Sequence, residues 1–261
     1  MIVELAVTWW GHSSVTVELG ATRIGTDPLL VDRFAHLRRH GVTPAPAAAD
    51  LDLVLISHLH GDHLHVPSLR RVDPRAPLVV PRGASALLTG LGRRDVIEVA
   101  PGDRLDVAGV TIEVLAAQHD DRRHPLSRRR APAIGFRVDD GVRSFWYPGD
   151  TGRDPAMAEV DPVDLALVPI GGWGPTLGDE HLGPEDAAIA VDLVGAAYAL
   201  PVHHGTFWPV GLKTVHRANH HRLFVTPGPR FAAAMQASPA SALLPEHGVR
   251  QILVYRDGEE R

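Results

Sequence analysis

Residues 51–65 read LDLVLISHLHGDHLH. The apolar run Leu51 to Ile56 has the length and the branched side chains of a buried strand. This run is followed at once by four residues that can bind a metal: His58, His60, Asp62 and His63. Imidazole and carboxylate groups are ligands that suit Zn²⁺ and similar divalent ions. An H-x-H-x-D-H array at the end of a buried strand therefore predicts a metal site rather than a solvated, histidine-rich turn.

The composition of the 261 residues is that of a globular domain, with 44% hydrophobic residues available for a core. The formal charge of −5 gives no overall attraction to nucleic acid or to an anionic membrane. There is no cysteine, so any metal must be held by nitrogen and oxygen ligands. No signal peptide and no bilayer-spanning apolar run is visible. We expect one domain, residues 1–261, in the cytoplasm and without an integral membrane segment.

The rest of the sequence alternates strand-like with helix-like segments. Residues 2–27 favour three antiparallel strands, and residues 133–147 favour a hairpin. Further strands are expected near residues 78–80, 96–99, 110–116, 164–168, 198–202 and 251–255, and helices near residues 66–72, 84–91, 184–197, 212–221 and 231–237. This order predicts an α/β sandwich (αββα), with two facing mixed sheets and helices outside. Residues 32–49 are expected at the surface, and the sequence leaves open whether they cover the site.

More candidate ligands stand at the ends of predicted strands: Asp27, His119, Asp150 and His203. Taken alone, each of these residues is more often a turn former, a cap or a surface residue. In an α/β arrangement, however, loops at the same ends of the strands collect in one crevice, where their side chains can meet. The repeated order of strand, potential ligand and polar turn therefore adds these four residues to the predicted metal site.

These residues resemble the ligand pattern of the metallo-β-lactamase fold superfamily of binuclear metallohydrolases. The motif HLHGDH at residues 58–63, followed by His119, Asp150 and His203, matches that pattern in order. The resemblance implies one metal on His58, His60 and His119, and a second on Asp62, His63 and His203, with Asp150 bridging the two. It also implies that Asp27 orients the ligands through hydrogen bonds.

Within the superfamily, four segments resemble the branch that contains N-acylphosphatidylethanolamine-hydrolysing phospholipase D and L-ascorbate-6-phosphate lactonase. They are WWGHSSVTVELG (9–20), YPGDTG (147–152), EHLGPEDA (180–187) and PVHHGTF (201–207). The third segment implies that His181 contacts the substrate, and the fourth selects His203 rather than His204 as the ligand. His204 and Asp120 depart from the branch pattern, which argues against a long-chain phospholipid substrate. His204 is either a substrate contact or a packed residue.

The resemblance implies a cofactor of two divalent metal ions, with zinc favoured and manganese or iron as alternatives. Two such ions would lower the pKa of a shared water and so provide a hydroxide that attacks a phosphodiester or a lactone. In this mechanistic hypothesis Asp62 holds the second metal and can accept a proton. His181 is the candidate substrate contact or general acid, with a surface histidine as the equally weighted alternative.

The substrate is expected to be a small molecule, and a phosphorylated one is among the candidates. Three further residues are candidates for contact with it: Arg122, Arg123 and Trp173. The arginines can bind phosphate, or they can belong to a solvated loop. Trp173 can line the pocket or lie in the core. A metallo-nuclease is the alternative function, and the acidic net charge argues against it. A redox or non-catalytic metal protein is disfavoured by the complete ligand set. A homo-oligomer is left open.

Overall fold

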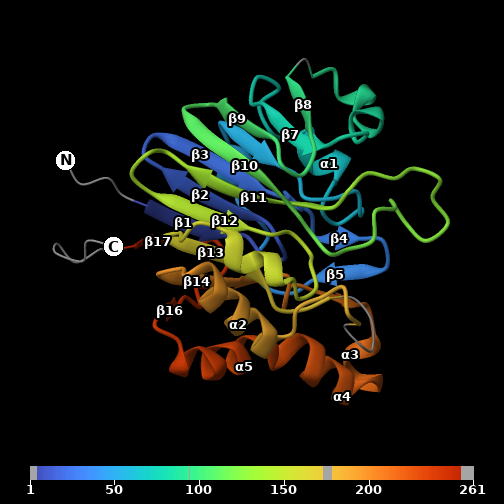
Figure 1. The fold of residues 1–261 in the computed structure, drawn as a ribbon. Helices are drawn as coiled ribbons and strands as arrows, with labels where there is room; N and C mark the ends of the chain where they lie inside the picture. Colours follow the sequence, from blue (N-terminus) through green and yellow to red (C-terminus); the bar gives the residue numbers. More distant parts are fainter. Residues whose placement is uncertain (1–4, 94, 173–177, 254–261) are drawn as a thin grey trace.

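The computed structural model describes residues 5–93, 95–172 and 178–253. Two seven-stranded mixed sheets face each other, which confirms the predicted α/β sandwich (Figure 1). The first sheet has the strand order β17-β1-β2-β3-β6-β7-β8, and the second has the order β16-β14-β13-β12-β11-β10-β9. The described ends of the chain meet in the first sheet, where Leu5 pairs with Leu253.

The strands of the first sheet are β1 (Leu5–Trp9), β2 (Val15–Leu19), β3 (Thr22–Thr26), β6 (Leu53–Leu55), β7 (Leu78–Pro81), β8 (Val96–Val99) and β17 (Arg250–Leu253). Those of the second are β9 (Arg104–Val107), β10 (Val110–Ala116), β11 (Ile134–Asp139), β12 (Ser144–Tyr147), β13 (Leu165–Pro169), β14 (Tyr198–Val202) and β16 (Ser241–Ala242). The three opening strands and the 133–147 hairpin are antiparallel, as predicted.

The core between the sheets explains the apolar run that begins at Leu51. Leu53 and Leu55 of β6 face the second sheet, whereas Val54 and Ile56 face the outer layer. Side chains alternate along a strand, so a strand covered on both faces is apolar at every position. Strand β6, which leads into the His-rich loop, is therefore buried on both faces. Its burial fixes the position at which the loop begins.

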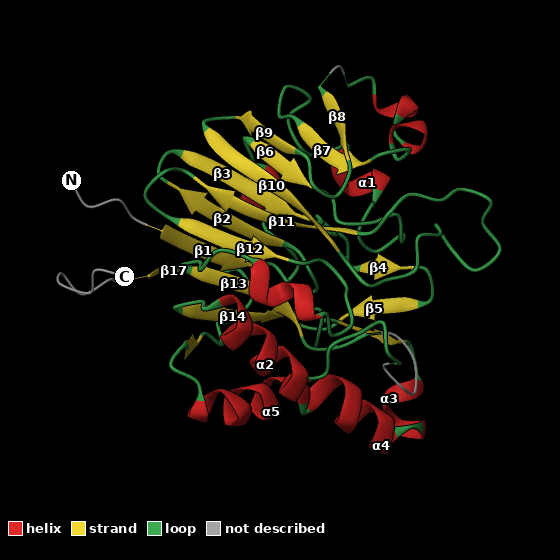
Figure 2. Cartoon of the chain, in the orientation of Figure 1, coloured by secondary structure: helices red, strands yellow, loops and turns green. Residues whose placement is uncertain are grey.

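Helices cover the outer faces of both sheets (Figure 2). The long helix α2 (Pro184–Val194) and α5 (Pro227–Ala234) pack against the second sheet. The short α1 (Val66–Leu69) and two 3-10 turns, Ser85–Leu87 and Thr89–Leu91, cover the first. Further 3-10 turns lie at Pro46–Ala49, Pro155–Glu159 and Met235–Ala237. No helix among the described residues has the length and apolar character needed to cross a bilayer.

Two predicted helices take other forms. Residues 84–91 form two 3-10 turns instead of one α-helix, with Gly90 inside the second turn and Gly92 in a left-handed conformation after it. Glycine disfavours a continuing α-helix at these positions. Residues 212–221 split into α3 (Leu212–Val215) and α4 (Arg217–His220), and a π-helical turn follows at His221–Val225.

The predicted surface segment, residues 32–49, is fastened to the body of the protein by a third sheet. Strands β4 (Arg33–Phe34) and β5 (Leu37–Arg39) pair with each other, and β5 pairs with β15 (Phe207–Pro209). The buried guanidinium of Arg39 donates hydrogen bonds to the carbonyl oxygens of Val31 and Trp10 at 3.0 and 2.8 Å. The segment therefore packs beside the His-rich loop, where the Phe34 ring lies 5.8 Å from the ring of His65.

Candidate metal centre

The predicted ligands converge because they follow neighbouring strands at the same end. Strands β3 and β6 are parallel, as are β12, β13 and β14. The loops that leave them carry Asp27, the 58–63 motif, Asp150 and His203. The carboxyl ends of parallel strands open into one crevice, as the sequence predicts. The YPGD turn also needs its glycine: Gly149 has φ +66°, and a Cβ there would lie 2.5 Å from the Ser57 side chain.

The first ligand group consists of His58, His60 and His119. Nε2 of His58 and Nε2 of His119 lie 3.0 and 3.1 Å from Nδ1 of His60. The opposite nitrogens are held in place: Nδ1 of His119 donates to the carbonyl oxygen of Glu180 at 3.2 Å, and Nδ1 of His58 lies 2.9 Å from Oγ of Ser57. Since a carbonyl oxygen can only accept, Nε2 of His119 carries a lone pair that points at its partners.

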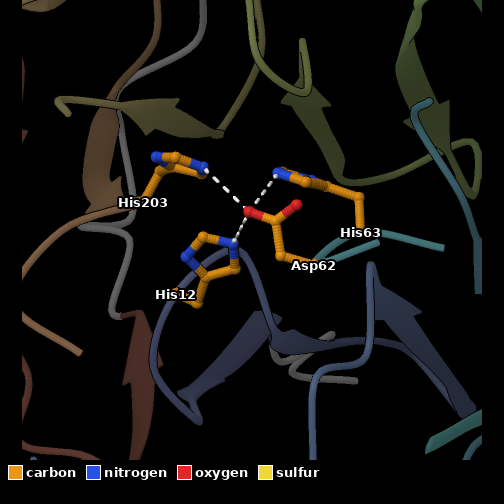
Figure 3. A group of neighbouring side chains, drawn as sticks. All are labelled: His12, Asp62, His63 and His203. Carbon is orange, nitrogen blue, oxygen red and sulfur yellow. Dashed lines mark hydrogen bonds and ion pairs between the residues drawn. The ribbon is translucent and has the colours of Figure 1, made fainter. Parts of the chain in front are cut away.

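The second ligand group consists of His12, Asp62, His63 and His203, all buried (Figure 3). The Oδ2 atom of Asp62 lies 3.1 Å from Nε2 of His12, 3.8 Å from Nε2 of His63 and 4.0 Å from Nε2 of His203. Nδ1 of His203 donates to the carbonyl oxygen of Gly171 at 3.1 Å. The second imidazole nitrogen, Nε2, is thereby left with its lone pair directed into the group.

His12 is a member of this group that the sequence analysis did not assign. It stands in the WWGHSS turn between β1 and β2, with φ +55°. Its carbonyl oxygen accepts hydrogen bonds from the backbone N–H of His203 at 3.1 Å and from Nε1 of Trp9 at 2.9 Å. Its own N–H donates to Oγ1 of Thr206 at 2.6 Å. A histidine directly after a turn glycine, in a motif already noted for its resemblance, was the available signal.

Asp150 lies between the two groups. Its Oδ2 atom is 3.0 Å from Nε2 of His203, 3.4 Å from Nε2 of His63 and 3.8 Å from Nδ1 of His181. Asp150 also forms a group of potential ligand atoms with His119 of the first set and His181. Its Oδ1 atom is buried and makes no hydrogen bond to any residue that the structure describes. A carboxylate in this position can serve both groups.

Asp27 supports one histidine of each group. Its buried carboxylate accepts hydrogen bonds from the backbone N–H of Ser57 at 2.8 Å, from Nδ1 of His63 at 2.7 Å and from the hydroxyl of Tyr147. The hydroxyl of Ser57 also donates to Asp27, so it accepts from Nδ1 of His58. Asp27 therefore orients His63 directly and His58 through Ser57, which fits the role that the resemblance implies.

Burial and mutual charge shape the protonation of the site. Burial, assisted by the neighbouring His63, holds the pKa of His58 well below its usual value. Burial alone would raise the pKa of Asp62, but the imidazoles of His63 and His12 hold it well below its usual value. Burial works against a proton on His63, yet Asp150, Asp62 and Asp27 raise its pKa well above the usual value. The site contains fixed negative charge that a cation can neutralise.

The donor set fits divalent metal ions. Buried Nε2 of His63, Nε2 of His203 and Oδ1 of Asp150 make no hydrogen bond within the described residues. Buried polar atoms normally have partners, so three such atoms on neighbouring side chains indicate a bound group. Imidazole nitrogens and carboxylate oxygens suit a borderline divalent ion, whose binding would displace the proton on His63.

The predicted substrate residues have different surroundings. The ring of His181 lies 4.9 Å from that of His119, and burial lowers its pKa to about 4. His204 stacks on Trp9 at 5.0 Å between ring centroids. Arg122 pairs with Asp120 at 3.0 Å. Trp173 lies outside the described residues.

Arg123 contacts the His-rich loop itself. Its guanidinium donates to the carbonyl oxygen of Leu64 at 2.9 Å and also to that of Leu59. These bonds bracket the turn that carries His60, Asp62 and His63. In the structure the side chain therefore supports the loop, while a contact between this arginine and a substrate stays a prediction.

Comparison with known proteins places this site in a family. Residues 22–204 match the family model described as "Beta-lactamase superfamily domain". The chain is 30% identical over 233 residues to the N-acyl-phosphatidylethanolamine-hydrolyzing phospholipase D 1 of Caenorhabditis elegans, with 79% of this chain and 65% of that protein covered. It therefore spans just under two thirds of the length of that relative. It is also 30% identical over 213 residues to a UPF0173 metal-dependent hydrolase of Methanopyrus kandleri, with 79% of this chain and 86% of that protein covered.

A solved structure shows the same fold. The metallo hydrolase Igni18 from Ignicoccus hospitalis superimposes with a TM-score of 0.70 at 20% identity, over 97% of this chain and all of that one. The fold, the family match and the cluster of histidines and aspartates agree with one another. The chain belongs to the metallo-β-lactamase superfamily.

Proposed function

We propose that the protein holds two divalent metal ions, zinc first and manganese or iron as alternatives, and hydrolyses an ester bond in a small molecule. The bond is either a phosphodiester or a lactone or simple carboxylic ester. The observation that carries this proposal is the pair of adjacent ligand groups with Asp150 between them, its Oδ2 atom within 3.4 Å of two imidazole nitrogens of the second group.

In this proposal His58, His60 and His119 hold one ion, while Asp62, His63 and His203 hold the other, and Asp150 serves both. His12 completes the buried group through its contact with Asp62. Two ions held by these residues would lower the pKa of a bound water and would neutralise charge that grows on the substrate oxygen. Asp62 also offers a carboxylate that can accept a proton at the reacting centre.

His181 is proposed to contact the substrate. Its side chain is 16% exposed, its ring lies 4.9 Å from that of His119, and its Nδ1 atom has no hydrogen-bond partner among the described residues. The replacement His181→Ala is expected to lower kcat/KM by about 10- to 100-fold, with the metal content unchanged. A loss of metal from this variant would instead make His181 a ligand and refute the assignment.

The nuclease alternative has less support. A nucleic-acid surface needs cationic groups that are free to meet phosphates. In the loop that follows His119, Arg122 pairs with Asp120, Arg130 pairs with Asp121 at 2.6 Å, and Arg123 is bonded to backbone carbonyls. Salt-dependent binding of RNA would support the alternative, and its absence would remove it.

The test is turnover by protein whose bound metal has been quantified, with bis(p-nitrophenyl) phosphate and a panel of simple lactones as substrates. Two metals per chain with cleavage of either class supports the proposal and selects the bond. Less than one tightly bound metal per chain, with no turnover of any substrate, contradicts it.

A further inference from the structure

A cavity of about 240 Å³ opens directly beside the second ligand group. His12 and His203 form the side of the cavity nearest the candidate metal centre. The opposite walls come from one continuous part of the chain, β15 through α4 and the π-helical turn. They are formed chiefly by apolar side chains: Phe207, Trp208, Leu212, Leu223 and Phe224. The cavity is therefore continuous with the place where a substrate's ester bond would lie.

The aromatic side chains that line the cavity also contact histidines outside its lining. The rings of Trp208 and His220 meet at right angles, 4.9 Å apart, and the ring of His220 stacks on Phe224 at 4.8 Å. His40 contacts Phe224 from the other side at 5.2 Å. The π-helical turn His221–Val225 carries Leu223 and Phe224 to the cavity. Such turns are uncommon and occur frequently at functional sites.

The residues that line the cavity favour uncharged groups over charged ones. Among the described residues that line the cavity there is no aspartate, glutamate, lysine or arginine. Oγ1 of Thr206 is already bonded to the N–H of His12 and to the carbonyl oxygen of His204. The lining also contains polar side chains, among them Asn219 and His216, but among the described residues it offers a phosphate no lysine or arginine to balance its charge. An apolar group loses nothing and gains contact with aromatic and aliphatic surface.

The volume sets a limit on size. Pockets that hold whole drug-sized ligands range over about 300–1,000 Å³. The volume of about 240 Å³ is smaller than this range. The cavity therefore fits one part of a ligand, such as a single aromatic ring or a short alkyl chain.

We propose that this cavity binds a compact apolar group of the substrate, an aryl group or a short alkyl chain, while the scissile ester bond lies at the two ligand groups. This inference rests on the proposed function and narrows it to esters that carry such a group next to the reacting bond.

The experiment measures binding of n-alkylphosphonates, from methyl to dodecyl, to metal-loaded protein by calorimetry. The phosphonate group is tetrahedral and negatively charged, like a phosphoester or the intermediate of carboxylic ester hydrolysis, and its carbon–phosphorus bond is not hydrolysed. A buried methylene contributes about 0.8 kcal/mol, which is a gain in affinity of roughly fourfold. We expect the dissociation constant to fall by roughly three- to fourfold per methylene up to hexyl or octyl, and then to level off.

Two tryptophan variants on one helix provide the matched comparison. Leu212 lines the cavity, so Leu212→Trp should fill part of it and weaken hexylphosphonate binding by about 10-fold or more, with methylphosphonate unaffected. Val215 lies on the same helix, is 71% exposed and is not among the lining residues. Val215→Trp should leave both dissociation constants unchanged.

The outcomes separate the two proposals. Affinity that is independent of chain length overturns the cavity assignment, whether or not the protein hydrolyses esters. Affinity that keeps rising to dodecyl overturns the size limit. Equal effects of Leu212→Trp and Val215→Trp overturn the location. The absence of turnover with every ester, in protein that holds two metals and shows the expected chain-length dependence, contradicts the proposed hydrolysis but leaves the apolar subsite in place.

Discussion

The two ligand groups of the candidate metal centre are built in different ways. The first, His58, His60 and His119, contains no carboxylate, and two of its imidazoles are only half-buried. The second places Asp62 among three imidazoles, with every member buried. The first, open group thus lies toward the solvent side of the crevice, whereas the second, enclosed group is surrounded by the protein. The second group should therefore depend more strongly on the surrounding fold.

The backbone shows how the enclosed group is fixed. His12, Asp27 and His203 all have positive φ angles, +55°, +34° and +60°. Such conformations are unfavourable for residues other than glycine and persist where surrounding structure enforces them. Here the N–H of His203 donates to the carbonyl oxygen of His12 at 3.1 Å, and the N–H of Asp27 donates to that of Leu55 at 3.0 Å. These hydrogen bonds within the fold hold the side chains in position.

The largest effect is expected from removing the only carboxylate of the enclosed group. Asp62→Asn keeps the shape of the side chain but removes the charge that faces His12, His63 and His203. We expect this variant to lose one equivalent of metal. The transition state then loses several kcal/mol of stabilisation by the metal, which lowers kcat by about 10³-fold. Elemental analysis and steady-state kinetics measure both. His60→Ala is the comparison in the open group. Turnover by Asp62→Asn near the wild-type value would show that the enclosed group is not needed for catalysis.

A smaller effect is expected from the residue that supports both groups. Asp27→Asn removes the acceptor shared by His63 and Ser57, so both histidines lose orientation. Metal affinity should fall by about 10- to 100-fold for each ion, as measured by competition with a chelator. Tyr147→Phe removes only one donor to the same carboxylate and should have a weaker effect. Loss of only one ion in Asp27→Asn would show that the link through Ser57 to His58 is unimportant.

The third prediction separates the groups by stability. His12→Ala leaves a buried cavity and removes the hydrogen bond between His12 and Asp62, so metal-free protein should lose about 2–4 kcal/mol of unfolding free energy. His60 is half-buried, and His60→Ala should change that free energy by less than about 1 kcal/mol while lowering the metal content. Denaturant unfolding of chelator-treated protein measures both. Equal losses in the two variants would mean that the enclosed group is no more integral to the fold than the open one.

The sequence predicts those residues of the site that stand directly after a strand. His58, His60, Asp62 and His63 are recognisable because they follow a buried strand within a few positions. His119, Asp150 and His203 are recognisable because each follows a strand. The structure brings all of them together, and their metal ligation stays a prediction. These are local signals, and the parallel order of the strands converts them into one site.

What the sequence does not predict depends on contacts between distant parts of the chain. His12 joins the site because its turn is fixed by Thr206 and His203, far along the sequence. The third sheet depends on pairing between β5 and β15, two strands too short to give a recognisable alternation. The apolar cavity depends on a π-helical turn, for which residue spacing gives no signal. Each of these features follows from tertiary structure rather than local pattern.

The smallest predicted effect isolates what burial does to an imidazole that has no carboxylate beside it. His247 contacts Trp9 edge to face at 4.3 Å, outside both ligand groups. Burial, with a smaller contribution from Arg39, lowers its pKa to about 4, whereas the carboxylates around His63 raise the pKa of that residue. Between pH 6.5 and about 4 the unfolded chain therefore binds a proton on His247 that the folded protein does not. Stability should fall as the pH falls through this range.

His247→Phe keeps an aromatic ring against Trp9 but cannot bind a proton. In chelator-treated protein, the loss of unfolding free energy between pH 7 and pH 4 should be smaller for this variant than for the wild type, by at most about 2 kcal/mol because the ring is partly solvated. Denaturant unfolding at a series of pH values measures the difference. If the two proteins lose stability in parallel, the acid sensitivity comes from groups other than His247.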